Sequence, residues 1–362
     1  MYTINSKIKK AIIFHHDDMD GQVAGKIAEH FLKEQDRKID INLYEVGYHK
    51  EVKLATSEFD HSTLVIITDY SFHLTVFDDL VNMVGPENII WIDHHKSAIE
   101  TYKMYPKLYL IDGLRYIGLS GAELTYHFFK HDIRTISQDW EIVPLPPTKK
   151  NIVKNVTNKT VIFEPLCLYL VGEWDTWRYD EDDPTAKQFS AGYLMKKPQL
   201  DDYSDEAENF WKLFYLQDVV YDVTVDEESM KYMDKTDEIL NTGKVVNDYI
   251  AMTNKTNLQR FAFAAKIDKF PNIECVALNS TARSSLVFDD VKKHFHVGLV
   301  YSFNGKFMCY SIYRLDKDPD IKIDVSEIAR CYGGGGHPGA AGFNTEHRLI
   351  VQKVDDIDEY LV

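Results

Sequence analysis

The sequence lacks the features of membrane proteins and of disulfide-rich proteins. No apolar run approaches the roughly 20 residues that a membrane-spanning helix needs. Residues 11–14 form only a brief apolar segment after the polar N-terminus, too short for a signal peptide and typical of a strand. Only four cysteines occur, at positions 167, 275, 309 and 331, and no two form a CxxC pair. We therefore expect no disulfide framework, no thiolate zinc site and no membrane partner, and we expect a cytoplasmic protein.

Positive charge is also scarce. The 362 residues include 41 Lys and Arg against 57 Asp and Glu, which gives a formal net charge of −16. Proteins that bind long duplex DNA rely on basic side chains to neutralise phosphates, so we expect no such partner. The charge balance favours a small or short phosphate-containing substrate and leaves acidic side chains to bind divalent cations. A content of 44% hydrophobic and 27% charged residues indicates a soluble globular chain, long enough for two domains.

Apolar segments rich in β-branched residues predict a parallel sheet near the N-terminus. They lie at residues 11–15, 62–69 and 88–93, and helical periodicity follows the first of them. Strands that are apolar throughout and separated by helices are buried on both faces, which predicts an α/β fold. We assign this parallel-sheet domain, with flanking helices, to residues 1–203. The proline-containing stretch 140–165 within it is predicted to be a loop or insertion that could hold a short hairpin.

The second half of the chain predicts a helical connector and a smaller mixed α/β domain. The connector covers residues 204–260, and the C-terminal domain covers 261–362. Strands are expected at 261–267, 275–279, 296–303 and 306–313. A last helix is expected at 324–332, with Asp324 as its N-cap and Glu327 at capping-box spacing.

Ionisable side chains follow all three strands of the predicted parallel sheet. His16, Asp18 and Asp20 alternate after the first strand, so they project to the same side of an extended chain. Asp69 ends the second strand, and the triplet 93–95 (Asp-His-His) ends the third. Taken singly, such acids are commonly helix caps or turn residues. Because ligands gather beyond the carboxyl ends of parallel strands, the joint pattern predicts a metal site. Imidazole and carboxylate ligands suit Mn²⁺, with Mg²⁺ or Fe²⁺ as alternatives.

A glycine-rich segment near the C-terminus predicts an anion-binding loop. Four glycines, Gly333, Gly334, Gly335 and Gly336, precede His337 in a chain with only 18 glycines. Consecutive glycine N–H groups can approach a phosphate closely, and His337 and Arg314 would add charged hydrogen bonds. The alternative is a flexible turn that ends the preceding helix.

Together these residues carry a resemblance to a known family. In chain order, the motif His16-x-Asp18-x-Asp20, then Asp69, the 93–95 triplet and Asp175 resemble the motifs of DHH phosphoesterases. The segment 324–343, with its Gly-Gly-Gly-Gly-His run, resembles the C-terminal domain associated with them. The resemblance spans nearly the whole chain. Its compact first motif is most similar to nanoRNases and RecJ-like exonucleases.

The resemblance implies a role for each of these residues. One Mn²⁺ would be held by His16, Asp18 and Asp69, and a second by Asp20, Asp69, His94 and Asp175, with Asp69 bridging the two. His95 would face the scissile phosphate, so His95 and Asp69 are the implied catalytic residues. Arg314, Gly333, Gly334, Gly335, Gly336 and His337 would bind the substrate. Leu315 stands where the family motif has a serine, which leaves the phosphate contacts of Arg314 open. His15 and Asp17 are the alternative register for His16 and Asp18.

The implied activity is hydrolysis of short oligonucleotides (nanoRNA or dinucleotides) to mononucleotides by a metal-activated water, in a cleft between the domains. The alternatives are a cyclic-dinucleotide phosphodiesterase, a pyrophosphatase or polyphosphatase, and a catalytically silent nucleotide-binding protein. Candidates for base stacking in the C-terminal domain are Tyr301, Phe303, Tyr310 and Tyr313, with core packing as the alternative. The sequence does not determine the oligomeric state, and a homodimer is one possibility.

Overall fold

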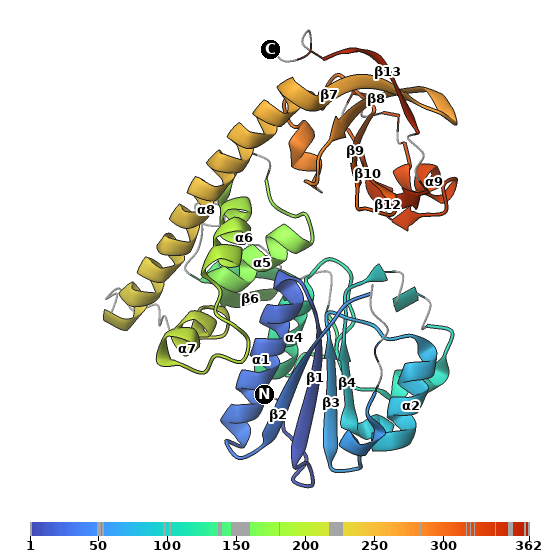
Figure 1. The fold of residues 1–362 in the computed structure, drawn as a ribbon. Helices are drawn as coiled ribbons and strands as arrows, with labels where there is room; N and C mark the ends of the chain where they lie inside the picture. Colours follow the sequence, from blue (N-terminus) through green and yellow to red (C-terminus); the bar gives the residue numbers. More distant parts are fainter. Residues whose placement is uncertain are drawn as a thin grey trace. The chain divides into compact units, whose positions relative to one another are not determined.

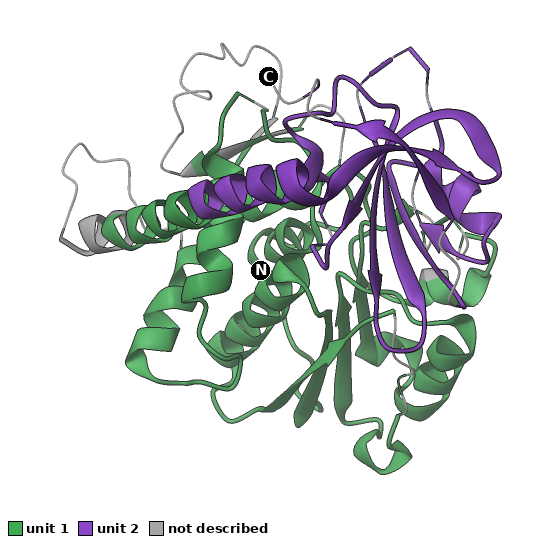
Figure 2. Cartoon of the chain, turned by 45° about the horizontal axis from the view of Figure 1, so that its top comes forward, with its two compact units in different colours: residues 1–246 green, residues 247–362 purple. Residues whose placement is uncertain are grey.

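The computed structural model divides the chain into two compact units, residues 1–246 and 247–362 (Figure 2). It describes residues 2–48, 52, 54–96, 99–100, 103–136, 140–145, 160–180, 182–216, 227–282, 284–315, 317–318, 320–321, 323–336, 338–346, 350–357 and 360. The boundary between the units falls inside the long helix α8 (Glu227–Phe261). No helix in the described ranges combines the length and apolar character needed to cross a lipid bilayer.

Unit 1 is built on a four-stranded parallel sheet with the strand order β2-β1-β3-β4 (Figure 1). Its strands are β1 (Lys10–His16), β2 (Asp40–Val46), β3 (Thr63–Thr68) and β4 (Ile89–Ile92). The prediction of an α/β fold with strands near 11–15, 62–69 and 88–93 is therefore confirmed. The strand β2 was not predicted from the sequence. Only one of its seven residues is buried, and Asp, Asn and Glu interrupt its apolar positions.

Helices cover both faces of this sheet, as the apolar character of β1, β3 and β4 requires. Side chains alternate along each strand: Ile13 on β1 and Ile66 on β3 pack on the side of α1 (Met19–Gln35) and α4 (Gly121–His131). Ile12 and Val65 pack on the opposite side, against α2 (Leu74–Val84). The hydrophobic core on the α1 side of the sheet also includes residues of the helices α5 (Leu166–Asp175), α6 (Thr185–Lys196) and α7 (Asp205–Trp211).

The stretch 140–165 contains two strands, β5 (Trp140–Leu145) and β6 (Thr160–Pro165). They pair in parallel, with Trp140 opposite Thr160, so the expectation of a hairpin is wrong. A hairpin needs antiparallel strands joined by a short turn, whereas here fourteen residues, 146–159, separate the two strands. Two of the four prolines and all of the lysines of this stretch belong to that intervening segment, which lies outside the described residues. This composition hid the two flanking strands in the sequence.

Unit 2 is a seven-stranded mixed sheet with the order β11-β12-β10-β9-β8-β7-β13. Its elements are β7 (Ala262–Ile267), β8 (Phe270–Asn279), β9 (Val297–Phe303), β10 (Met308–Arg314), α9 (Val325–Arg330), β11 (Gly335–Gly336), β12 (Ala340–Thr345) and β13 (Val351–Asp356). Only β8 and β9 run parallel, while the other neighbours are antiparallel. The four predicted strands and the last helix are present, and the prediction of a smaller mixed domain is confirmed.

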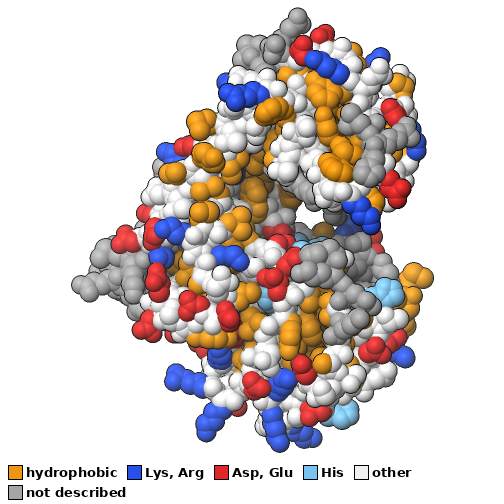
Figure 3. Space-filling model, in the orientation of Figure 1, with side chains coloured by type: hydrophobic (Ala, Val, Ile, Leu, Met, Phe, Trp, Pro, Cys, Tyr) orange, Lys and Arg blue, Asp and Glu red, His pale blue; other side chains and the backbone are white. Residues whose placement is uncertain are grey.

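Acidic and basic side chains are interspersed on the face shown in Figure 3, with basic ones gathered at the lower edge of unit 1. The face in view therefore carries charges of both signs.

Candidate metal centre

The carboxyl ends of β1, β3 and β4 bring histidines and carboxylates together at one edge of the sheet. His16 is the last residue of β1, Asp69 follows β3, and the 93–95 triplet follows β4. Three overlapping groups form, and within each the potential ligand atoms lie within 4.8 Å of one another. The groups are His16, Asp18 and Asp69; Asp20, His94 and Asp175; and Asp69, His94 and His95. All six residues predicted to bind metal thus lie in one place, although 159 positions separate His16 from Asp175 in the sequence.

Asp69 lies where these groups meet, and its environment is unusual. The residue is 1% exposed, and its backbone has a left-handed φ of 56°. Neither of its carboxylate oxygens has a hydrogen-bond partner among the described residues. His94 Nε2 lies 3.1 Å from Oδ1, and His16 Nδ1 lies 3.8 Å from Oδ2. Buried carboxylate oxygens are normally satisfied, so this pair of unsatisfied oxygens fits a bound cation.

The N-terminus of α4 holds Asp20 in place. The backbone N–H groups of Gly121 and Ala122 donate to the two oxygens of Asp20, at 2.6 and 2.9 Å. These N–H groups have no partner within the helix, and the helix dipole favours a carboxylate there. Position 121 must be glycine, because a Cβ there would overlap the side chain of Asp69. One helix end therefore orients Asp20 and leaves room for Asp69.

Asp18 both caps a helix and joins the cluster. Its Oδ1 accepts the N–H of Gly21 at 3.0 Å, as an N-cap of α1 does. Its Oδ2 lies 2.8 Å from His16 Nδ1. Burial alone would lower the pKa of His16, but the hydrogen bond and charge of Asp18 outweigh it and raise that pKa. Asp18 is therefore a helix cap and a member of the potential ligand cluster at the same time.

The carboxylates of the cluster repel one another when no cation is bound. Burial, together with the charges of Asp20 and Asp18, raises the pKa of Asp69 well above its ordinary value. The same causes raise the pKa of Asp175 to about 9. Burial lowers the pKa of His94, which favours the neutral imidazole that binds metals. Oxygen and imidazole ligands around unsatisfied, mutually repelling carboxylates fit divalent cations.

His95 is held by Asp93 beside the cluster. Its Nδ1 and its backbone N–H contact Asp93 Oδ1 at 2.8 and 3.0 Å. Ser71 Oγ donates to the other oxygen of Asp93. Burial acts to lower the pKa of His95, but the hydrogen bond with Asp93 outweighs it and raises that pKa. Because Asp93 engages Nδ1, the second ring nitrogen of His95 is available to a ligand.

An ion pair between a buried carboxylate and a half-buried arginine beside the cluster was not predicted. Glu123 on α4 is fully buried and accepts a hydrogen bond from Arg178 Nη2 at 2.6 Å. Arg178 follows Asp175 by three residues, so the pair connects the helix that holds Asp20 to the segment that carries Asp175. Ser120 and Glu123 form a capping box, with Ser120 N–H donating to Glu123 at 2.7 Å. The Ser-x-x-Glu spacing was readable in the sequence, whereas the pairing with Arg178 was not.

The alternative residues His15 and Asp17 lie elsewhere. His15 is fully buried on the face of β1 that α1 covers, and a Cβ on Gly25 would come within 2.8 Å of its ring. It belongs to none of the three potential ligand groups in the described chain. Asp17 Oδ1 lies 3.5 Å from His16 Nε2, at the outer side of the cluster.

In unit 2, the predicted substrate-binding residues gather around β10, α9 and β12. Arg314 is exposed at the end of β10, and its backbone N–H donates to Gly339 O at 2.9 Å. The N–H groups of Gly333 and Gly334 donate to Arg330 O and Ala329 O, each at 3.0 Å. These two glycines thus end α9, as the alternative interpretation of the loop proposed.

The remaining glycines of the run, Gly335 and Gly336, pair with β12. His337 lies outside the described residues. The binding of phosphate by this loop and by Arg314 stays a prediction. Of the stacking candidates, Tyr310 is buried and stacks on Phe343 with ring centroids 4.8 Å apart, so it packs in the core.

The fold of this chain is that of a DHH-domain protein. A solved DHH domain, described as belonging to a member of a family of ribosomal proteins, aligns over 98% of this chain and 84% of its own, with a TM-score of 0.51 and 12% identity. A pGpG-specific phosphodiesterase from Vibrio cholerae aligns over 94% of both chains, with a TM-score of 0.39 and 13% identity. The exonuclease RecJ bound to manganese aligns over 93% of this chain and 86% of its own, with a TM-score of 0.44 and 12% identity. No protein-family model and no curated protein matches the sequence.

Proposed function

We propose that this protein is a metal-dependent phosphodiesterase that hydrolyses short oligonucleotides to mononucleotides. The observation that carries the proposal is Asp69, whose two buried, unsatisfied oxygens lie where the three potential ligand groups meet. His16 and Asp18 would complete one site, and the group Asp20, His94 and Asp175 the other. Two divalent cations, with Mn²⁺ as the first choice, would lower the pKa of a water molecule and neutralise the phosphate.

The residues of the chain would orient the substrate and move protons. His95 would donate a hydrogen bond or a proton to a phosphate oxygen through Nε2, since Asp93 holds Nδ1 and favours the protonated ring. Asp20 would stay fixed because two backbone N–H groups hold its carboxylate. Arg314 and the loop 333–337 would stabilise negative charge on the phosphate.

Two features support a short nucleotide substrate. The net charge of −16 disfavours a long nucleic acid, whose binding depends on phosphate neutralisation. The compact His16-x-Asp18-x-Asp20 motif resembles that of nanoRNases. A cyclic-dinucleotide phosphodiesterase would use the same metal cluster, so the substrate has to be identified by experiment.

The test is a panel of substrates offered to the purified protein with Mn²⁺. We expect turnover of di- to pentanucleotides and weaker turnover of a cyclic dinucleotide. The Asp69→Asn variant should lose at least about 100-fold in rate, because Asp69 would bind the metals directly, whereas removing a residue that only supports a metal ligand costs about 10- to 100-fold. Circular dichroism would verify that the variant is folded. Turnover of pyrophosphate alone, or full activity in Asp69→Asn, would refute the proposal.

A further inference from the structure

A small cavity of about 260 Å³ lies beside the metal cluster in unit 1. It is bordered by the carboxyl ends of β1 and β2 and by the segment that follows β2. Its described lining residues are Phe14, Asp17, Tyr44, Glu45, Val46, Gly47, Val52, Leu54, Ala55, Glu58 and Phe59. Asp17 connects the cavity to the cluster, because its Oδ1 lies 3.5 Å from Nε2 of His16. A ligand whose phosphate lies at the metal cluster would therefore reach this cavity with its neighbouring group.

One part of the cavity wall is apolar and aromatic. Tyr44 and Phe14 are directly opposite each other on β2 and β1, and their rings stack with centroids 5.5 Å apart. Phe59 and Leu54 are half-buried and pack with Phe14 in the same apolar cluster. Aromatic and aliphatic walls of this kind favour a flat aromatic ligand, since every nucleobase has a π-face that can stack.

The polar groups of the cavity accept hydrogen bonds. Glu58 is fixed through one oxygen, because the Tyr44 hydroxyl donates to its Oε2 at 2.8 Å. Glu45 is fixed in the same way by Gln22 Nε2, at 2.9 Å from its Oε2. Among the described lining residues the cavity has no Lys or Arg, and its polar side chains are three carboxylates and the Tyr44 hydroxyl. It favours a group that presents N–H donors, such as the exocyclic amino group of a base.

The route from this cavity to the cluster is lined by further rings. Tyr48, next to the lining residue Gly47, has its ring 5.5 Å from that of His16. Tyr48 also stacks on Tyr70, with centroids 4.7 Å apart, and lies 5.9 Å from the ring of His95. A sugar and its base could extend along these rings from a phosphate at the cluster.

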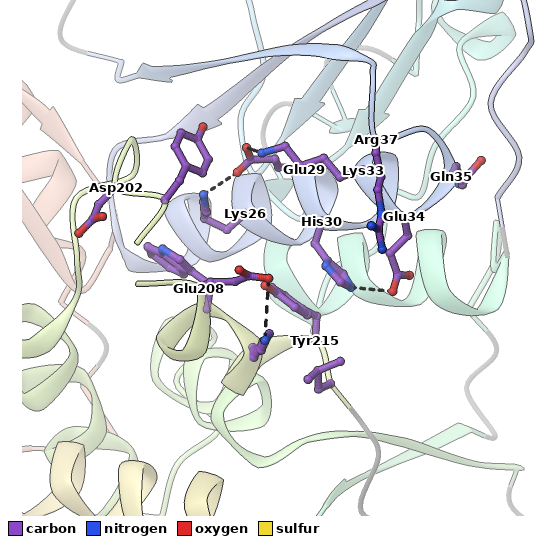
Figure 4. Close-up of a pocket in the computed structure, with 14 residues that line it drawn as sticks. Lys26, Glu29, His30, Lys33, Glu34, Gln35, Arg37, Asp202, Glu208 and Tyr215 are labelled. Atoms are coloured by element: carbon purple, nitrogen blue, oxygen red, sulfur yellow. Dashed lines mark hydrogen bonds and ion pairs between the residues drawn. The ribbon is translucent and has the colours of Figure 1, made fainter. Parts of the chain in front are cut away.

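A larger cavity in unit 1, of about 810 Å³, has no residue of the metal cluster among its described lining residues (Figure 4). It lies along the C-terminal part of α1, where several of its charged groups are paired with one another. Both oxygens of Glu29 are engaged by Lys26 and Lys33, each at 2.5 Å, and His30 lies 3.4 Å from Glu34. We infer no ligand there, and its residues provide a control.

We propose that the 260 Å³ cavity binds the base of the nucleotide adjoining the scissile phosphate and selects bases that carry an exocyclic amino group. The inference rests on the proposed function. It assigns base selection in part to unit 1, in addition to the stacking candidates of unit 2. Glu58 would be the acceptor that discriminates, with Tyr44 as the residue that orients it.

The test measures binding of AMP, CMP, GMP and UMP to the full-length protein with Mn²⁺ by isothermal titration calorimetry. We expect the three amino-bearing nucleotides to bind about tenfold more tightly than UMP. Glu58→Met, which removes the acceptor and keeps the length of the side chain, should bring this ratio close to one. Tyr44→Phe, which keeps the wall and removes the hydroxyl, should reduce the ratio partly. Glu34→Gln, in the larger cavity, should leave it unchanged.

The outcomes separate this inference from the proposed function. Hydrolysis of bis(p-nitrophenyl) phosphate by the wild-type protein tests the metal cluster without any base. If that ester is hydrolysed but all four nucleotides bind equally, the base cavity is refuted and the phosphodiesterase stands. If Glu58→Met instead removes one bound Mn²⁺ and leaves the base preference intact, the cavity is a cation site and the inference is wrong. Absence of hydrolysis of any phosphodiester would refute the proposed function itself.

Discussion

Single residues of the metal cluster are arranged at the expense of the stability of the metal-free protein. Asp69 is 1% exposed, and its pKa is raised by burial and by the charges of Asp20 and Asp18. Asp175 has a pKa of about 9 for the same reasons. Such carboxylates are unfavourable when ionised, and binding of a cation removes the penalty. The cluster is therefore built for an ion.

We expect the stability of the metal-free protein to fall as the pH rises from about 7 to about 9. An acid whose pKa is higher in the folded state than in the unfolded state keeps its proton in the folded state across this window. The unfolded state then binds fewer protons, so rising pH favours unfolding. Below that window His30, His127 and His131, whose pKa values burial lowers to about 4, act in the opposite direction, because they take up protons on unfolding. The measurement is Tm against pH in EDTA, and Mn²⁺ should raise Tm most at the alkaline end.

Asp175→Asn should flatten this pH dependence in EDTA, since it removes one of the titrating groups. Asp237→Asn, an exposed position on α8, is the control and should leave the curve unchanged. A wild-type Tm that rises steadily with pH in EDTA would contradict the assignment of strained carboxylates to the cluster.

Whole elements support the cluster through the ends of helices. The N-terminus of α4 holds Asp20, and α5 ends at Asp175. Glu123, which is fully buried, and Arg178, which is half-buried, join these two segments through an ion pair at 2.6 Å. Burial raises the pKa of Glu123 to about 7, even though Arg178 acts to lower it. Arg178 thus favours the ionised form of a buried carboxylate and connects α4, which orients Asp20, to the segment that carries Asp175.

Arg178→Met should destabilise the protein by about 3 kcal/mol at pH 8, because it leaves Glu123 buried without its cation. The loss should be smaller at pH 5, where folded Glu123 can take up a proton. Urea unfolding at the two pH values measures both numbers. Mn²⁺ should bind about 10- to 100-fold more weakly, as when a residue that supports a metal ligand is removed.

Arg134→Met is the matched control for that experiment. Arg134 pairs with Asp112 at 3.0 Å, but both side chains are about 40% exposed, at 42% and 37%. An exposed pair contributes no more than about 1 kcal/mol. Equal losses in the two variants, or a loss in Arg178→Met that does not depend on pH, would argue against the supporting role of Arg178.

The whole molecule consists of two units that each have cores of their own. The cores of unit 1 enclose the parallel sheet, and those of unit 2 enclose the mixed sheet. All seven potential metal ligands lie in unit 1, while Arg314 and the glycine loop lie in unit 2. Metal binding and phosphate binding are therefore predicted to be separable.

A fragment of residues 1–261, which keeps unit 1 and the whole of α8, should bind Mn²⁺ with nearly the affinity of the full chain. Its hydrolysis of dinucleotides should be at least about 100-fold slower, the typical effect of losing groups that stabilise transition-state charge. Calorimetry measures the first quantity and a nucleotide assay the second. Full activity in the fragment would exclude unit 2 from the reaction.

The sequence by itself determined the α/β class and most of the candidate metal ligands. Local periodicity reveals buried strands such as β1, β3 and β4, because each shows as a pattern over a few residues. The histidines and acids that follow these strands can be recognised in the same way. The parallel direction of the strands then predicts that their carboxyl ends meet. The local pattern failed for β2, which has only one buried residue, and for β5 and β6, which contain Pro144 and Pro165.

Only the tertiary structure decided what surrounds those ligands. The N–H groups that hold Asp20 come from residues 121 and 122, about a hundred positions away. The ion pair of Glu123 with Arg178 and the cavity between Phe14 and Glu58 likewise join distant segments. Such contacts depend on which elements pack together. The residue pattern within one segment does not indicate which distant segment it will contact. The candidate ligands could therefore be read from the chain, whereas their supports and the base cavity required the fold.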